Sequence, residues 1–104
     1  MSTSVEVEVV NPSGIHARPA STFFKATRTF RSSIHVQNLT KGGAPVDTRS
    51  ILTLISSLDA SRGDRIRITA EGEDEASAAE SLRALVAGGL GEGGLGEGDR
   101  QAGS

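Results

Sequence analysis

The spacing of apolar residues along this chain switches between every second residue and a helical spacing, and this switching limits the folds available to it. Residues 3–10 place Val5, Val7 and Val9 on one face and polar residues on the other, which predicts a half-buried strand. After turn residues 11–14, apolar side chains at helical spacing predict a helix from about residue 16 to residue 28. Residues 32–37 alternate again and predict a second strand.

The second half of the chain repeats these patterns. It predicts a short strand over residues 44–47, a helix capped by Asp47 or Thr48, a strand over residues 65–71, and a last helix that opens on acidic residues 73–75. The buried stripe of the last helix is expected to be Ala76, Ala79, Leu82, Leu85 and Val86. The order β-α-β-β-α-β-α predicts an α+β domain with three helices on one face of a four-stranded antiparallel sheet.

The composition changes at residue 88, where a glycine-rich segment begins. The pentapeptide Gly-Leu-Gly-Glu-Gly occurs at residues 89–93 and again at 94–98. A segment of this kind buries too little apolar surface to offset its ordering entropy. We therefore expect one domain over residues 1–87 and a disordered tail over residues 88–104.

Charge and composition exclude several classes of function. Residues 11–46 contain five basic residues and no acidic one, which favours phosphate or an acidic partner, although the chain as a whole carries a net charge of −2. The chain has no cysteine, and its two histidines lack a ligand pattern, so we expect no metal and no cofactor. The absence of a lysine-rich stripe argues against nucleic acid. Without a signal peptide or a long apolar run, we expect a cytoplasmic protein without membrane insertion.

The segment Gly14-Ile15-His16-Ala17-Arg18-Pro19-Ala20 is the part of the chain that indicates a specific chemistry. A neutral imidazole at His16 is a nucleophile for a phosphoryl group. The free N–H groups of a helix start, together with the Arg18 guanidinium, suit phosphate oxygens. Ser13 precedes the motif and is a second candidate for contact with the ring or the phosphate.

Three segments of the chain resemble the HPr family, the histidine-containing phosphocarriers of the bacterial sugar phosphotransferase system. Residues 14–20 (GIHARPA) resemble its active-site signature, and residues 46–52 (VDTRSIL) resemble the segment with its regulatory serine. Residues 63–75 resemble its last strand and the entry to its last helix. The three segments lie in the family's order, the resemblance covers residues 3–87, and it implies the open-faced β-sandwich of that family.

The resemblance implies a phosphocarrier, which is a relay intermediate and not an enzyme. His16 would accept a phosphoryl group at Nδ1 from phosphorylated enzyme I, which takes it from phosphoenolpyruvate, and would pass it to a sugar-specific enzyme IIA. Arg18, Ser13 and Ala17 would support the phosphate. Ser50 matches the regulatory serine, whose partners would be a serine kinase/phosphorylase and a transcription regulator. The apolar residues Ile51, Leu52 and Ile55 are expected to form a docking surface, and the chain is expected to be monomeric.

Two other hypotheses fit the same sequence. A regulatory paralogue, in a nitrogen-type or dihydroxyacetone-kinase phosphorelay, would use the same His16 chemistry and act by binding a partner. A small α+β ligand-binding module would bind a metabolite and transfer no phosphoryl group. Sugar uptake in a strain without the chain separates the first alternative from the carrier, and labelling with phosphoenolpyruvate separates the second.

Overall fold

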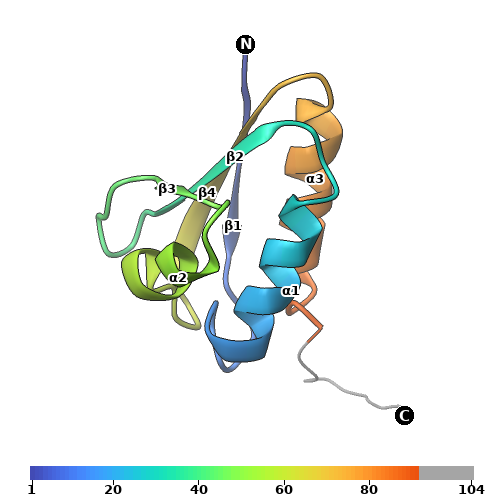
Figure 1. Ribbon diagram of the computed structural model, residues 1–104. Coiled ribbons are helices and arrows are strands. Elements are labelled where there is room, and N and C mark those ends of the chain that lie inside the picture. The colour runs from blue at the N-terminus through green and yellow to red at the C-terminus, as the bar shows by residue number, and fades with distance from the viewer. Residues whose placement is uncertain (92–104) are drawn as a thin grey trace.

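A computed structural model describes residues 1–91 and shows a two-layer arrangement of helices on a sheet (Figure 1). The elements follow the predicted order. The strands are β1 (Thr3–Glu8), β2 (Ser33–Asn38), β3 (Val46–Asp47) and β4 (Arg65–Glu71). The helices are α1 (Ala17–Thr27), α2 (Ile51–Thr53), which continues directly into a π-helical segment, η1 (Leu54–Leu58), and α3 (Glu75–Ala87).

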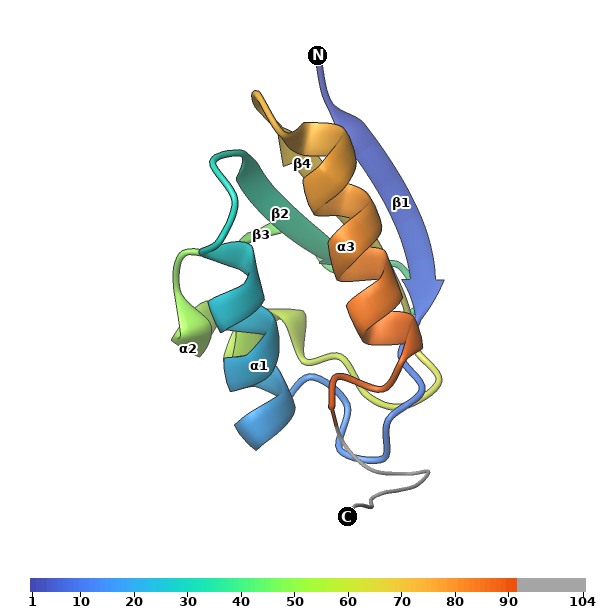
Figure 2. The ribbon, with the colours of Figure 1, turned by 90° about the vertical axis from the view of Figure 1, so that its right-hand side faces the viewer.

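The sheet has the strand order β1-β4-β2-β3, and every neighbouring pair is antiparallel. The long central strand β4 therefore pairs with β1 on one side and with β2 on the other. The helices cover one face of this sheet and leave the other face open (Figure 2). The predicted α+β open-faced sandwich is thus confirmed.

The core lies between the sheet and the helices, as the alternation of the strands requires. Val7, Ile66 and Ile68 point from the sheet to the helices, and Phe23 and Leu82 meet them from α1 and α3, all 8% exposed or less. The prediction for the last helix is wrong at one position, because Ala76 is exposed and Ala78 is buried instead. Within residues 1–91 no helix is long and apolar enough to cross a bilayer.

The packed part of the chain continues past the end of α3. Gly89 has a φ of 90°, and the amides of Gly89 and Leu90 donate to the carbonyls of Val86 and Leu85, which is the hydrogen-bond pattern of a Schellman motif. This turn places the Leu90 side chain in the core at 2% exposure. Core packing therefore extends beyond the expected boundary at residue 87. Most of the expected disordered tail, residues 92–104, lies outside the described residues, so its disorder stays a prediction.

Two local expectations around the second helix differ from the structure. The N-cap of α2 is Ser50, whose hydroxyl accepts from the Thr53 amide at 3.3 Å, and not Asp47 or Thr48. Thr48 instead donates its hydroxyl to the Ile34 carbonyl of β2, and Asp47 ends β3. The third strand is also shorter than the expected 44–47, because the register pairs only Val46 and Asp47 with β2.

Candidate active site

His16 stands immediately before α1, on a segment that the core holds in place. Ile15 is fully buried, and its amide donates to the Ala60 carbonyl at 2.8 Å. Gly14 has a φ of 65°, and a Cβ at this position would lie 2.3 Å from the Ala60 oxygen. Only glycine fits so close an approach with this backbone conformation. The two residues before His16 therefore fix its position against the loop that follows the second helix.

The backbone changes direction at His16 and Ala17. His16 is extended, with φ −133° and ψ 165°, and takes the N-cap position of α1 without a side-chain cap. Ala17 has a φ of 50°, a left-handed conformation that costs a non-glycine residue about 1 kcal/mol. Pro19 is buried in the first turn, where its missing N–H removes no helix hydrogen bond. The buried residues on either side, Ile15 and Pro19, hold the strained residue between them.

The His16 ring is 33% exposed and lies between two hydrogen-bond acceptors. Its Nδ1 is 3.1 Å from the Ser13 carbonyl oxygen, and its Nε2 is 2.9 Å from Oδ1 of Asp59. Both acceptors are satisfied together only when the ring carries a proton on each nitrogen. A neutral ring keeps one of the two contacts and has a free electron pair on the other nitrogen.

Asp59 is a site residue that the sequence analysis did not identify. It follows the π-helical segment in a left-handed conformation, with φ 47° and ψ 48°, which Asp tolerates better than most residues. The hydrogen bond from His16 and the charge of Lys41 hold the pKa of the Asp59 carboxyl below its ordinary value of 3.8. Asp59 is therefore ionised at neutral pH.

Lys41, from the loop between β2 and β3, holds the chain around Asp59. Its Nζ donates to the Asp59 carbonyl at 2.6 Å and to the Ser61 hydroxyl at 3.1 Å, and it pairs with Asp64 at 3.3 Å. Asp64 is buried and also accepts from the side-chain Nδ2 of Asn38 at 3.0 Å. The network joins a loop, a helix end and the start of β4. These contacts fix the position of Asp59 relative to the rest of the domain.

The other predicted site residues are placed as follows. Arg18 is exposed and makes no hydrogen bond or ion pair with residues 1–91, so its guanidinium is available to a ligand. Ser13 approaches the ring with its backbone carbonyl. Ser50 is exposed at the start of α2, one residue before the apolar set. In that set Leu52 is 74% exposed, while Ile51 and Ile55 are half-buried.

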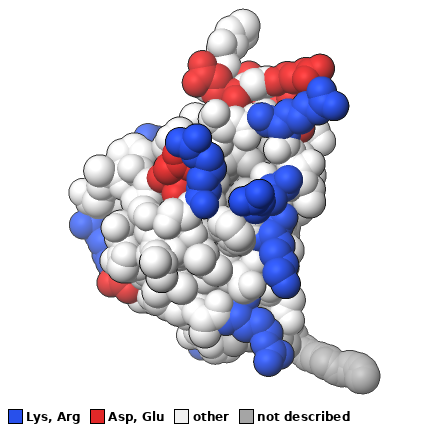
Figure 3. Space-filling model, in the orientation of Figure 1, with Lys and Arg blue, Asp and Glu red and all other residues white. Residues whose placement is uncertain are grey.

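The apolar set lies near the histidine, on the same side of the molecule. Both ribbon views place α2 beside α1, and the two helices are in contact (Figures 1 and 2). Lys and Arg side chains run down this face over α1, while acidic side chains gather at the other end of the molecule, where α3 begins (Figure 3). His16 at the start of α1, the basic side chains of α1 and the exposed Leu52 therefore lie on the same side of the molecule.

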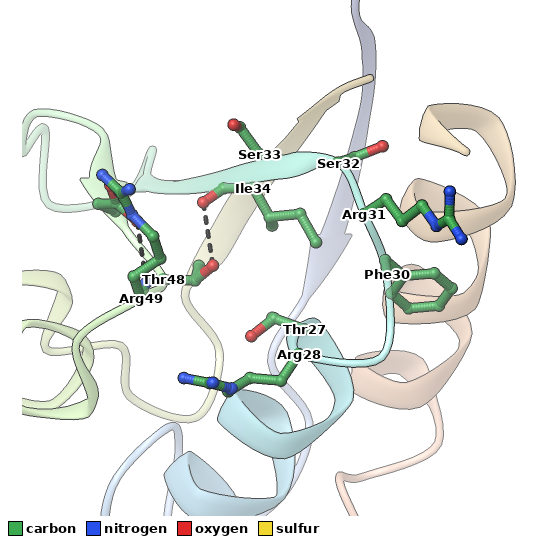
Figure 4. A pocket seen from close by; sticks show the side chains of 10 residues that line it. Thr27, Arg28, Phe30, Arg31, Ser32, Ser33, Ile34, Thr48 and Arg49 are labelled. Carbon is green, nitrogen blue, oxygen red and sulfur yellow. Dashed lines mark hydrogen bonds and ion pairs between the residues drawn. The ribbon is translucent and has the colours of Figure 1, made fainter. Parts of the chain in front are cut away.

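A pocket of about 400 Å³ lies away from this surface, between the C-terminal end of α1 and strands β2 and β3. Arg28 and Arg49 lie on two sides of its opening, and His16 is not part of its lining (Figure 4). The Arg49 guanidinium is paired with Asp47 at 2.6 Å. Among the described residues no group of three or more His, Cys, Asp or Glu side chains is placed to hold a metal ion.

Comparisons with known proteins agree with this geometry. The family model described as "PTS HPr component phosphorylation site" matches residues 3–88. The phosphocarrier protein HPr of Haemophilus influenzae is 39% identical over 83 residues, which are 80% of this chain and 93% of that protein. A multiphosphoryl transfer protein of the same organism is 40% identical over 82 residues, 79% of this chain. This chain spans only 16% of that longer relative.

Solved structures give the same answer. The crystal structure of HPr from Thermoanaerobacter tengcongensis superposes with a TM-score of 0.78 at 36% identity and covers 86% of this chain and 97% of that one. HPr from Bacillus anthracis superposes with a TM-score of 0.75 at 33% identity, over 82% of this chain and 96% of that one. Fold, family model and relatives all lead to one conclusion: the chain belongs to the HPr family of phosphocarrier proteins.

Proposed function

We propose that this chain carries a phosphoryl group on His16, taken from phosphorylated enzyme I and passed to a sugar-specific enzyme IIA. The observation that supports this most directly is the accessible imidazole at the start of α1, inside the segment that matches the family's phosphorylation-site model. An enclosed pocket at His16 would suit a small substrate. An open surface suits a phosphorylated side chain that another protein presents.

The transfer needs no group beyond the two proteins. The electron pair of one His16 ring nitrogen forms a bond to phosphorus while the phosphorus–nitrogen bond of the donor histidine breaks, and the bonding pair returns to the donor ring. The Arg18 guanidinium and the unpaired N–H groups at the start of α1 stabilise the phosphate oxygens. A carrier must also release the group, so this stabilisation has to be modest, which fits an arginine exposed to solvent.

The partners would dock on the surface around His16. Leu52, with Ile51 and Ile55 beside it, supplies apolar contact area, and the basic face of α1 supplies charge for an acidic partner. The same surface would serve enzyme I and enzyme IIA in turn, since both must reach the same ring. A carrier of this kind works as a monomer, because a second copy on this surface would exclude its partners.

Ser50 would change docking, without unfolding of the chain, if it carried a phosphate. It is exposed, it caps α2, and it adjoins the apolar set. A phosphate there would face the helix start and would compete with Asp47 for the Arg49 guanidinium. We propose Ser50 as a regulatory phosphorylation site for a serine kinase/phosphorylase, with a transcription regulator as one reader of the modified form.

The experiment is incubation with enzyme I and labelled phosphoenolpyruvate, followed by addition of enzyme IIA. We expect the wild type to take up label that is acid-labile and base-stable and to lose it to enzyme IIA. His16→Ala should take up none. His35→Ala is the matched control, because His35 is the other histidine and points outward from β2. Equal labelling of His16→Ala and wild type would show that another residue accepts the phosphoryl group.

A further inference from the structure

The carboxylate of Asp59 points at the ring nitrogen of His16 that lies opposite the Ser13 carbonyl, and this arrangement bears on which nitrogen reacts. Asp59 Oδ1 lies 2.9 Å from Nε2, while the acceptor at Nδ1 is a neutral carbonyl at 3.1 Å. A hydrogen bond to a carboxylate is stronger than one to a neutral carbonyl. When the ring is neutral, its single proton therefore stays on Nε2.

We propose that Asp59 is the positioning residue of this carrier: it holds the His16 ring as the Nε2–H tautomer and so leaves the electron pair on Nδ1 to accept the phosphoryl group. The effect on phosphoryl transfer rests on the proposed function. The tautomer of His16 does not, because it can be measured in the unphosphorylated protein. Asp59 contacts the ring at Nε2, the nitrogen that does not react, and so acts through the ring that it orients.

The same contact stabilises the phosphorylated state. When neutral Nδ1 bonds to phosphorus, the proton remains on Nε2, so the ring becomes a phosphoimidazolium with a positive charge. The Asp59 carboxylate then forms a charge-paired hydrogen bond with that ring, on the side away from the phosphate. No proton has to leave the site during the transfer, and none has to return when the phosphoryl group departs.

Contacts with surrounding residues fix the direction of the Asp59 carboxylate. Its role therefore depends on this geometry and not only on the presence of an acid near His16. The Asp59 backbone is held in its left-handed conformation at the end of the π-helical segment, and Lys41 binds the Asp59 carbonyl at 2.6 Å. The second carboxylate oxygen, Oδ2, is 3.6 Å from the Lys41 Nζ. One oxygen thus faces Lys41 and the other faces His16, which fixes the direction of the carboxylate.

Two variants separate the carboxylate from the backbone that carries it. Asp59→Gly removes the side chain and suits a φ of 47° without strain. Asp59→Asn keeps the shape and removes the charge, and Asn also tolerates this conformation. Glu80→Gln is the control for the loss of one negative charge, because Glu80 is an exposed acid on α3 that pairs with Arg83.

The first measurement is the nitrogen-15 NMR spectrum of the His16 ring in the unphosphorylated protein, at a pH where the ring is neutral. We expect the Nε2–H form in wild type and in Glu80→Gln. In Asp59→Gly the Ser13 carbonyl is the one acceptor that residues 1–91 still offer to the ring, so the proton should move to Nδ1, and Asp59→Asn should give a mixture. An unchanged tautomer in Asp59→Gly would overturn the proposal, whether or not the protein is a carrier.

The second measurement is the rate of labelling by enzyme I. We expect a fall of about tenfold in Asp59→Gly, a smaller fall in Asp59→Asn and no change in Glu80→Gln. A wild type that takes no label would refute the proposed function and leave the tautomer result to decide on Asp59. A wild type and an Asp59→Gly variant that are labelled at the same rate would refute the role of Asp59 alone.

Discussion

Replacing Leu90 by alanine tests whether the domain continues past the last helix. Leu90 is 2% exposed, and its amide donates to the Leu85 carbonyl at 3.0 Å. Alanine keeps that backbone hydrogen bond and has the same difficulty with a φ of 55° as leucine has. The substitution therefore removes side-chain packing and little else.

The expected loss follows from the atoms removed. Leu→Ala deletes three carbon groups, each worth about 0.8 kcal/mol when buried, and leaves a cavity that adds to the cost. Because Leu90 lies in the turn after α3 and not inside a helix or strand, its surroundings can partly close over the gap, which favours the lower end of the usual range. We expect the free energy of unfolding to fall by about 2.5 kcal/mol.

The assay is equilibrium unfolding in urea, with Leu52→Ala as the matched control. Leu52 is 74% exposed, so the same substitution there should change the free energy of unfolding by less than about 0.5 kcal/mol. Truncation after Gly89 should be less stable than truncation after Gly91, because only the first removes Leu90. A Leu90→Ala variant as stable as Leu52→Ala would refute the reasoning and would return the domain boundary to residue 87.

Two further predictions concern the docking surface and the acid side of the stability profile. Ser50→Asp should slow transfer from enzyme I and keep a melting temperature close to wild type, since Asp is also a good N-cap. The control Ser81→Asp, on the exposed side of α3, should change neither the transfer rate nor the melting temperature. Unchanged transfer kinetics in Ser50→Asp would remove this position from the docking surface. Hydrogen bonds from the Ser32 hydroxyl and from the backbone amides of Arg31 and Ser32 hold the pKa of Asp74 below its ordinary value of 3.8, so its contribution to stability is present above pH 3.8 and is lost as the pH falls below that value. Asp74→Asn should therefore be less stable than wild type at neutral pH, and urea unfolding should show the difference narrowing below pH 3.8; a difference that is constant with pH would mean that the charge of Asp74 contributes nothing.

The sequence predicted the fold well where a single periodicity decides the structure. The strands around Val7 and Ile68 and the helix around Phe23 each show one clear pattern, and each bury the face that the pattern predicts. The motif around His16 predicted that this residue stands at the start of a helix, and the structure confirms that place. These features depend on residues that are close in sequence.

The features that sequence reasoning missed depend on contacts between distant segments. Three residues that favour the N-cap position lie close together, Asp47, Thr48 and Ser50, and Ser50 takes the cap because Asp47 and Thr48 are already engaged at the sheet edge. Asp59 meets His16 only because the loop after the second helix packs against Gly14. In the sequence, Leu90 belongs to a glycine-rich repeat. Only the turn after α3 directs its side chain into the core. No local pattern marks any of the three.

The strand order also constrains how this chain can acquire its structure as it is made. β1 and β2 do not pair with each other, and both pair with β4, whose register joins Thr3 to Ala70 and Ser33 to Glu71. During synthesis β1 therefore leaves the ribosome without a partner, and β2 has only the two-residue β3 to pair with until the central strand β4 has followed. The cost of closing that long loop falls early in folding, before most native contacts form, so we expect a barrier dominated by chain entropy rather than by helix formation.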